Sequence, residues 1–524
     1  MYREHHMTKS RLLAGSWLLI TAAVAVAAVA TAAAGESEPA MPATLTPAAV
    51  ENFVDRKLGD LLRRSWVPGA AVSVVQGEHV LLVKGYGVAD VDTGVAVDGQ
   101  RTLFRVGSIT KVMTTLAALH LAEQGRFDLD ADVNRYLHSL RIEPTFPDPV
   151  TARLLMTHRG GFDSRLTGLM MSRDADTVLP PEARQHAFVR ARPVTAPFYY
   201  DNLGFGVLGT VVADIEGMTY RAAMRRLVFG PLKMTTAVIG LPAERVRDAA
   251  ACHRPDTFGR PARCEQGLIA DVSQGGGDAS VTAADMTRLM RALLVPGEFL
   301  KPETLRRMKD TDTQRLHPRL PGLGLALREA DYAGYRTLGH HGSINGFNSE
   351  FALFPASGVG VFISVNGDEA PAGPRMASTV LGAGVAMGAI DARPLIDEFI
   401  GSFARQFISS ESRIPPTHVP EVADEPTTTQ LAGVYSRPDE STFQEPGPTV
   451  ASPTKVTLTQ DGHLDAYGCA PFIRKAPMYY ECTPAVGAPI ELAFKRDVAG
   501  RLLLGHIAIE ALVRQPSAPA DNQR

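Results

Sequence analysis

The stretch FRVGSITK, residues 104–111, leads directly into an apolar run with helical spacing. Ser108 is then expected at the helix start, where unpaired backbone N–H groups and the helix dipole favour negative charge on its oxygen. Lys111 follows three residues later, so it returns to the same helix face one turn on. A lysine there can accept the serine proton if burial lowers its pKa. The stretch therefore predicts a nucleophile, Ser108, and its base, Lys111.

The same spacing occurs a second time, at Ser452 and Lys455. That copy precedes an alternating run typical of a β-strand, so no helix would orient its lysine. Serine is also a common helix N-cap, which is the ordinary structural explanation for Ser108. The Ser-x-x-Lys spacing alone is therefore weak support for catalysis.

Two further motifs follow residues 104–111 in the chain, Tyr200-Asp201-Asn202 and His340-His341-Gly342. In this order the three resemble the motifs of the serine β-lactamase and penicillin-binding-protein superfamily, in its class C and D-Ala-D-Ala carboxypeptidase branch. The resemblance covers roughly residues 50–390. It implies that Tyr200 acts as partner base and acid, and that Asn202 hydrogen-bonds Lys111 and the substrate amide.

The resemblance also implies roles for the third motif. Gly342 would let substrate approach the strand backbone, and the N–H groups of Ser343 and Ser108 would form the oxyanion hole. His340 would supply a donor or part-time positive charge near a substrate carboxylate. In β-lactamases a lysine holds the position of His340, and a small residue is usual at the position of Asp201. Both departures favour esters or D-amino-acid peptides over penicillins as substrates.

The pattern of elements predicts an α+β fold, an antiparallel sheet flanked by helices plus a helical subdomain, as in β-lactamases. A helix is expected at 49–64, followed by a hairpin of strands at 70–76 and 79–84. The middle, 111–310, is mostly helical. Late strands at 348–354 and 359–365 and a helix at 374–390 would complete the region, with the sheet closed by both of its ends.

The composition divides the chain into segments. A Ser-, Pro-, Thr- and Glu-rich stretch is typical of a linker, and short alternating runs after it predict a small all-β barrel. The sequence LAGVY at 431–435 resembles the lipocalin-like domain attached to many such hydrolases. The expected segments are 1–34, an export signal or membrane anchor; 35–48, a tether; 49–407, the hydrolase-like domain; 408–428, the linker; 429–514, the barrel; and 515–524, a disordered tail.

The N-terminus carries a basic start followed by an apolar run over residues 12–34 that ends in three alanines. This is typical of a cleaved export signal, although about 20 apolar residues could also anchor the chain in a membrane. Either alternative puts the bulk of the chain outside the cytoplasm. A cleaved protein would be periplasmic or secreted, and an uncleaved one would be anchored to the membrane.

The four cysteines fit that location. Cys252 lies near Cys264 and Cys469 near Cys482, so two local disulfides are the preferred pairing among three possible connectivities. Two buried pairs of free thiols are the alternative. The cysteines and histidines show no zinc-ligand spacing, and no metal or other cofactor is expected.

A net charge of −3 gives no broad basic surface, so nucleic acid is a poor candidate partner and a small-molecule or peptide substrate is expected. The oligomeric state stays open. The sequence therefore predicts a serine hydrolase that forms an acyl-enzyme with esters or D-amino-acid peptides, with cell-wall material among the candidate substrates. The alternatives are a penicillin-recognising or peptidoglycan-sensing binding protein with little turnover, a true β-lactamase, and an anchored structural protein.

Overall fold

The computed structural model describes residues 44–162, 171–172, 188–191, 193–194, 200–256, 260–265, 268–269, 274–312, 315–344, 346–368, 392–410, 425–436, 454–466, 469–482, 490–496, 502–505 and 511–514. The expected export segment, the expected helix at 374–390, the expected tail, and most of the expected tether and linker lie outside these residues. Within them, no helix has the length and apolar character needed to cross a membrane.

Six strands form the central antiparallel sheet, in the order β10-β11-β12-β13-β1-β2. Their bounds are β1 Gly69–Gln76, β2 His79–Gly87, β10 Arg328–Tyr332, β11 Tyr335–Ile344, β12 Phe347–Phe354 and β13 Val359–Val365. The expected hairpins are present at both ends of the region. Strand β13 pairs with β1, with Ala70 opposite Val365, so the two ends share one sheet as predicted.

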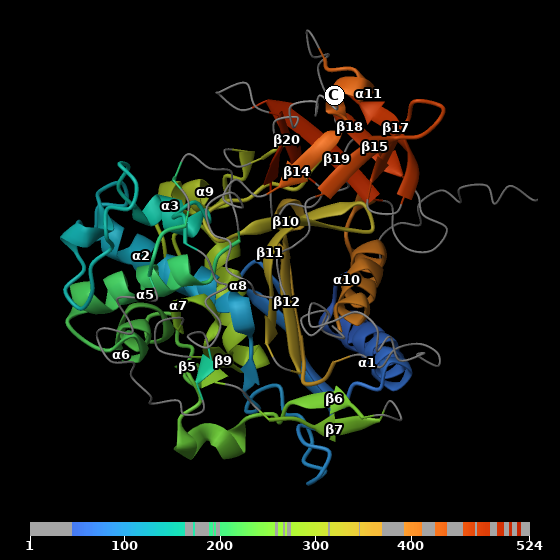
Figure 1. The fold of residues 1–524 in the computed structure, drawn as a ribbon. Coiled ribbons are helices and arrows are strands. Elements are labelled where there is room, and N and C mark those ends of the chain that lie inside the picture. Colours follow the sequence, from blue (N-terminus) through green and yellow to red (C-terminus); the bar gives the residue numbers. More distant parts are fainter. Residues whose placement is uncertain are drawn as a thin grey trace, which may run out of the picture. The chain divides into compact units, whose positions relative to one another are not determined.

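One face of the sheet is covered by α1 (Pro47–Ser65) and α10 (Arg393–Phe407), which lie together in Figure 1. Helix α1 begins where the Thr46 hydroxyl accepts a hydrogen bond from the Ala49 N–H, and it ends at Trp66 in the left-handed region. Its buried residues recur at helical spacing, beginning with Val50, Val54 and Leu58. This apolar stripe explains why the helix packs on the sheet.

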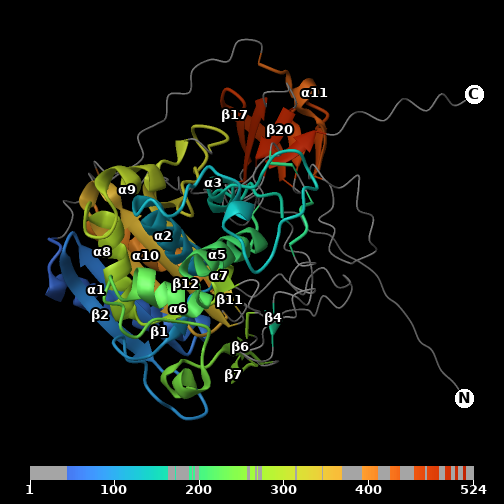
Figure 2. The same cartoon turned by 90° about the vertical axis from the view of Figure 1, so that its left-hand side faces the viewer.

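The opposite face carries the helical part of the region, seen in Figure 2. The helices there are α2 Thr110–Glu123, α3 Ala152–Met156, α5 Leu203–Glu216, α6 Tyr220–Met224, α7 Gln274–Gly277, α8 Ala283–Leu294 and α9 Pro302–Lys309. Short strands connect them: β3 Phe104–Arg105, β4 Met171–Ser172, β5 Val238–Ile239, β6 His253–Pro255, β7 Pro261–Arg263, β8 Leu268–Ile269 and β9 Ala279–Val281. Strand β3 pairs with β9, which fixes the start of α2 beside the sheet. The α+β prediction is confirmed.

The C-terminal part is a closed antiparallel barrel, as the alternating runs predict. Its elements are α11 Thr428–Leu431, β14 Gly433–Ser436, β15 Thr454–Leu458, β16 Leu464–Ala466, β17 Cys469–Ala476, β18 Tyr479–Cys482, β19 Ile490–Arg496, β20 Leu502–Gly505 and β21 Ala511–Arg514. Buried aromatic and aliphatic side chains fill it, among them Tyr435, Phe472 and Leu504. The likeness to lipocalins and the domain boundaries stay predictions.

Candidate active site

Ser108 lies in a short 3₁₀ turn, Gly107–Ile109, that runs directly into α2. Gly107 has a φ of +49°, and a Cβ there would lie 2.9 Å from the backbone N of Ser343, so glycine is needed on both counts. The Thr110 hydroxyl donates to the Gly107 carbonyl at 2.7 Å and accepts from the Ala279 N–H at 2.9 Å. The turn that presents Ser108 is therefore held from two sides.

Lys111 is fully buried at the centre of the site. Its Nζ lies 3.0 Å from Ser108 Oγ, 2.7 Å from Asn202 Oδ1 and 2.5 Å from the Gly276 carbonyl oxygen. Burial lowers the pKa of Lys111, because the charged form loses its hydration, although the nearby Tyr200 partly opposes this shift.

The lowered pKa of Lys111 favours its neutral amine form, which can satisfy these partners. An NH₂ group has two N–H donors and one lone pair. Asn202 Oδ1 and the Gly276 carbonyl can only accept, so they take the two N–H groups of Lys111. In the neutral form the lone pair of Lys111 can accept the proton of the Ser108 hydroxyl, whose oxygen lies 3.0 Å away, and this is the role of a general base.

The Tyr200-Asp201-Asn202 segment sits at the start of α5. The buried Asp201 carboxylate accepts hydrogen bonds from the N–H groups of Leu203 and Gly204, both at 2.8 Å. Asp201, unusual for the motif, is thus a helix cap that fixes the neighbouring residues. The Tyr200 ring lies 4.9 Å from Lys111 Nζ.

The buried His158 ring packs against the Tyr200-Asp201-Asn202 segment. Its Nδ1 accepts a hydrogen bond from the Asp201 N–H at 3.1 Å, and its ring centroid lies 4.4 Å from that of Tyr200. Burial and the nearby Lys111 hold the pKa of His158 well below its usual range. The neutral ring is therefore a structural support for Tyr200.

His340 and His341 point to opposite faces of β11. His340 is opposite Phe351 and only 1% exposed, whereas His341 is opposite Glu350, whose carboxylate lies 3.3 Å from the His341 ring. Burial, together with Arg328 and Lys111, holds the pKa of His340 well below its usual range. The His340 ring is therefore neutral near pH 7.

The hydrogen bond of His340 narrows its role further. Its Nδ1 lies 2.5 Å from the His341 carbonyl oxygen, which can only accept, so Nδ1 carries the proton. The remaining Nε2 of a neutral ring is an acceptor. This geometry argues against the expected part-time positive charge and favours a ring that accepts a hydrogen bond.

Gly342 brings the sheet against the serine turn. A Cβ on Gly342 would lie 1.9 Å from the Val106 carbonyl oxygen and 3.1 Å from the Ser108 N. The glycine is therefore required for the packing of β11 against the turn, rather than for the expected approach of substrate. This packing brings the backbones of Ser108 and Ser343 together, where their N–H groups are expected to form an oxyanion hole.

The predicted residues from three distant segments thus meet around Lys111. One partner, Gly276, belongs to the run Gly275-Gly276-Gly277, which none of the three motifs includes. A Cβ on Gly275 would lie 2.2 Å from the Phe205 carbonyl oxygen, and one on Gly276 would lie 2.9 Å from that of Asn202. Three consecutive glycines were the available signal that α7 approaches α5 closely enough to contact the lysine.

Known proteins resemble this chain in sequence and in fold. A family model described as Beta-lactamase matches residues 54–384. A β-lactamase of Yersinia enterocolitica is 26% identical over 255 residues, which are 48% of this chain and 61% of that protein. Protein flp of Staphylococcus aureus strain N315 is 27% identical over 190 residues, 35% of this chain and 37% of that protein. The match therefore spans less than two thirds of each relative.

Solved structures share the fold over a longer span. SurE superposes with a TM-score of 0.61 at 19% identity, covering 89% of this chain and all of SurE. A second crystal structure, of SurE with D-Leu, superposes with a TM-score of 0.59 at the same identity. At this identity the likeness concerns the fold alone.

Proposed function

The chain belongs to the β-lactamase family, and we propose that it is a serine hydrolase with Ser108 as nucleophile and Lys111 as general base. The observation that carries this proposal is the set of three contacts made by the buried Lys111 Nζ. They leave the lone pair of a neutral amine for the Ser108 hydroxyl. A helix N-cap alone would not need a buried lysine beside it.

The reaction proceeds through two acyl transfers. In the first, Lys111 takes the Ser108 proton while the oxygen attacks the substrate carbonyl, and the N–H groups of Ser108 and Ser343 stabilise the oxyanion. Tyr200 passes a proton to the leaving group, which departs and leaves an acyl-enzyme. In the second, water gives a proton to the same groups as its oxygen attacks the acyl carbonyl. The ester bond to Ser108 then breaks, the proton passes to Ser108 Oγ, and the acid is released.

The substrate class follows from the charge of the site. Because the His340 ring is neutral, it offers no fixed cation to the carboxylate of a β-lactam. Esters and amides that need no carboxylate anchor are therefore the first proposed substrates, and D-amino-acid peptides are proposed on the resemblance to D-Ala-D-Ala carboxypeptidases. The D-Leu in a SurE structure, a protein of the same fold, supports testing D-amino acids.

We place this activity outside the cytoplasm. The predicted pairs Cys252–Cys264 and Cys469–Cys482 are both disulfides, which form and persist in oxidising compartments. This supports export to the periplasm or the medium.

Intact-mass measurement over time tests the proposal. The purified protein is mixed separately with a short ester, a D-Ala-D-Ala peptide and a penicillin, and the mass of the protein is followed alongside product release. We expect an adduct that forms and decays with the ester or the peptide. A persistent adduct without product would favour a sensor, and turnover of penicillin alone would favour a β-lactamase. No adduct and no product with any of the three would contradict the proposal.

A further inference from the structure

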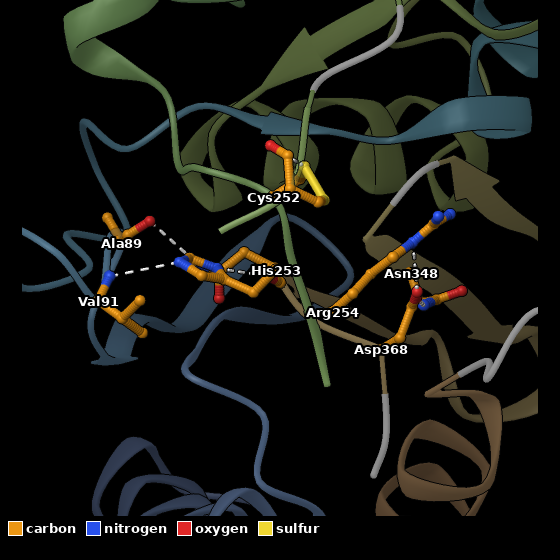
Figure 3. The surroundings of a disulfide bond; sticks show 9 residues. Ala89, Val91, Cys252, His253, Arg254, Asn348 and Asp368 are labelled. Atoms are coloured by element: carbon orange, nitrogen blue, oxygen red, sulfur yellow. Dashed lines mark hydrogen bonds and ion pairs between the residues drawn. A yellow bond between two sulfur atoms is a disulfide. The ribbon is translucent and has the colours of Figure 1, made fainter. Parts of the chain in front are cut away.

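The Cys252–Cys264 disulfide lies beside the active-site strands, at the base of the β6–β7 hairpin (Figure 3). Cys252 is fully buried, and its carbonyl accepts a hydrogen bond from the Cys264 N–H at 2.9 Å. The disulfide and this bond together fix residues 252–264 as a closed loop. The segment that leads into the loop contacts the chain shortly before the serine turn and shortly after Ser343.

The first contact is with the turn that joins β11 to β12. Gly346 in this turn has a φ of +68°, and a Cβ there would lie 2.8 Å from the His253 carbonyl oxygen and 3.0 Å from the Cys252 Cβ. The turn therefore rests directly on the backbone beside the disulfide. Ser343 lies three residues before Gly346, on the last residues of β11.

The second contact is with the segment that leads to Ser108. The Leu103 N–H donates to the Asp248 carbonyl at 2.8 Å, and the Ala250 N–H donates to the Leu103 carbonyl at 2.9 Å. Leu103 immediately precedes β3, which runs into the serine turn. Residues 248–253 therefore contact the approach to Ser108 at one end and the turn after Ser343 at the other.

His253 anchors this segment to the sheet. Its Nδ1 lies 2.8 Å from the Asn366 carbonyl, and its Nε2 accepts from the Val91 N–H at 3.3 Å. The Asp368 N–H donates to the His253 carbonyl at 3.2 Å. Asp368 in turn accepts from Asn348, the residue opposite Ser343 in the β11–β12 ladder, as Figure 3 shows in part.

We propose that the Cys252–Cys264 disulfide is a positioning element of the active site, which fixes the spacing between the N–H groups of Ser108 and Ser343. It acts through residues 248–253, which brace the serine turn and the end of β11 against each other. The inference rests on the proposed function, because it assumes that these two N–H groups stabilise an oxyanion. Its effect is on the reaction step rather than on substrate binding.

The second disulfide provides a matched control. Cys469 and Cys482 join β17 and β18 within the barrel, and they close a loop of nearly equal length, 13 residues apart against 12. Loss of either disulfide should raise the conformational entropy of the unfolded chain by a similar amount. Only loss of Cys252–Cys264 should alter the oxyanion hole.

The test compares Cys252→Ala/Cys264→Ala with Cys469→Ala/Cys482→Ala, using an ester and the matching thionoester. An oxyanion hole is spaced for oxygen, so its loss slows the ester more than the sulfur analogue. We expect the Cys252→Ala/Cys264→Ala variant to acylate the ester about ten-fold more slowly, because a displaced donor should lower the rate less than the roughly 10²–10³-fold loss caused by removing one. Its KM, and its rate with the thionoester, should change less than about two-fold. The barrel variant should match the wild type on both substrates.

Gly346→Ala keeps the disulfide and pushes the turn off His253, so it tests the same contact if the cysteine variant does not fold. It should lower the ester-to-thionoester ratio in the same direction. An unchanged ratio in a folded variant, or equal loss with both substrates, would overturn the inference. Absence of any acylation in the wild type would instead refute the proposed function.

Discussion

The chain contains the Ser-x-x-Lys spacing in two regions, and in the part of the chain that the structure describes only the first places its lysine on a helix beside the serine. At 108–111 the two residues lie on a 3₁₀ turn and the first turn of α2, with 3.0 Å between Lys111 Nζ and Ser108 Oγ. At 452–455 the lysine lies on strand β15, where its side chain is exposed, and Ser452 lies outside the described residues. A lysine on a strand has no helical turn to carry its side chain back over a residue three positions earlier.

Burial is the second difference between the copies. Lys111 is removed from water and its pKa is lowered, while Lys455 keeps its contact with solvent. The comparison teaches that the spacing is suited to proton transfer only where a helix aligns the pair and burial favours the neutral lysine.

Loss of the nucleophile should have the largest effect. Ser108→Ala should reduce ester or peptide turnover at least about a thousand-fold, because Ser108 supplies the oxygen that carries the acyl group. Steady-state assays of the purified variant measure the loss. Ser452→Ala is the control, and its turnover should match that of the wild type. Comparable losses of turnover in both variants would show that the two copies of the spacing do not differ in function.

Replacement of the base should rank next. Lys111→Arg should slow acylation by about 10²–10⁴, since a guanidinium cannot lose its proton and general-base catalysis contributes factors of this size. Lys455→Arg should change the rate less than about two-fold. Stopped-flow acylation with a chromogenic ester measures both. A Lys111→Arg enzyme of near wild-type rate would show that Lys111 does not take the proton.

The pH dependence should report the lowered pKa of Lys111. Only the neutral amine accepts a proton, and its fraction grows about ten-fold per pH unit until the pH reaches the pKa. The acylation rate should therefore rise with pH and reach a plateau below the ordinary lysine pKa of about 10.4. A rate that falls with rising pH, or that climbs past about pH 10 without a plateau, would contradict this assignment.

The smallest effect is expected at the helix cap beside Asn202. Asp201→Ala removes two hydrogen bonds at the start of α5 and should lower the free energy of unfolding by about 1–2 kcal/mol. Activity should fall only a few-fold, through a looser Asn202. Asp461→Ala, on the exposed surface of the barrel, should change stability by less than about 0.5 kcal/mol. Equal melting curves for both variants would show that the Asp201 carboxylate does not stabilise the start of α5.

Local patterns predicted much of this architecture because they depend on neighbours in sequence. Helix periodicity places Lys111 over Ser108, hairpins at both ends predict the sheet, and short cysteine spacings predict both disulfides. The cap formed by Asp201 was also open to prediction, since an aspartate just before a helix is a common N-cap.

Other features depend on distant parts of the chain. The Gly276 carbonyl meets Lys111 across 165 residues, and no local pattern indicates which carbonyl a buried lysine will contact. The charge of His340 depends on its burial and on Arg328 and Lys111, which only the folded chain brings near. Likewise, Gly342 is needed because Val106 lies against it, a contact between segments far apart in sequence.

The location of a covalent label tests the central claim most directly. The protein is treated with a serine-directed phosphonate, digested, and mapped by mass spectrometry. A single adduct on the peptide that contains Ser108, absent in Ser108→Ala and retained in Ser452→Ala, is the predicted result. A label on Ser452 or on another residue, or equal labelling of the Ser108→Ala variant, would contradict the assignment of Ser108 as the nucleophile.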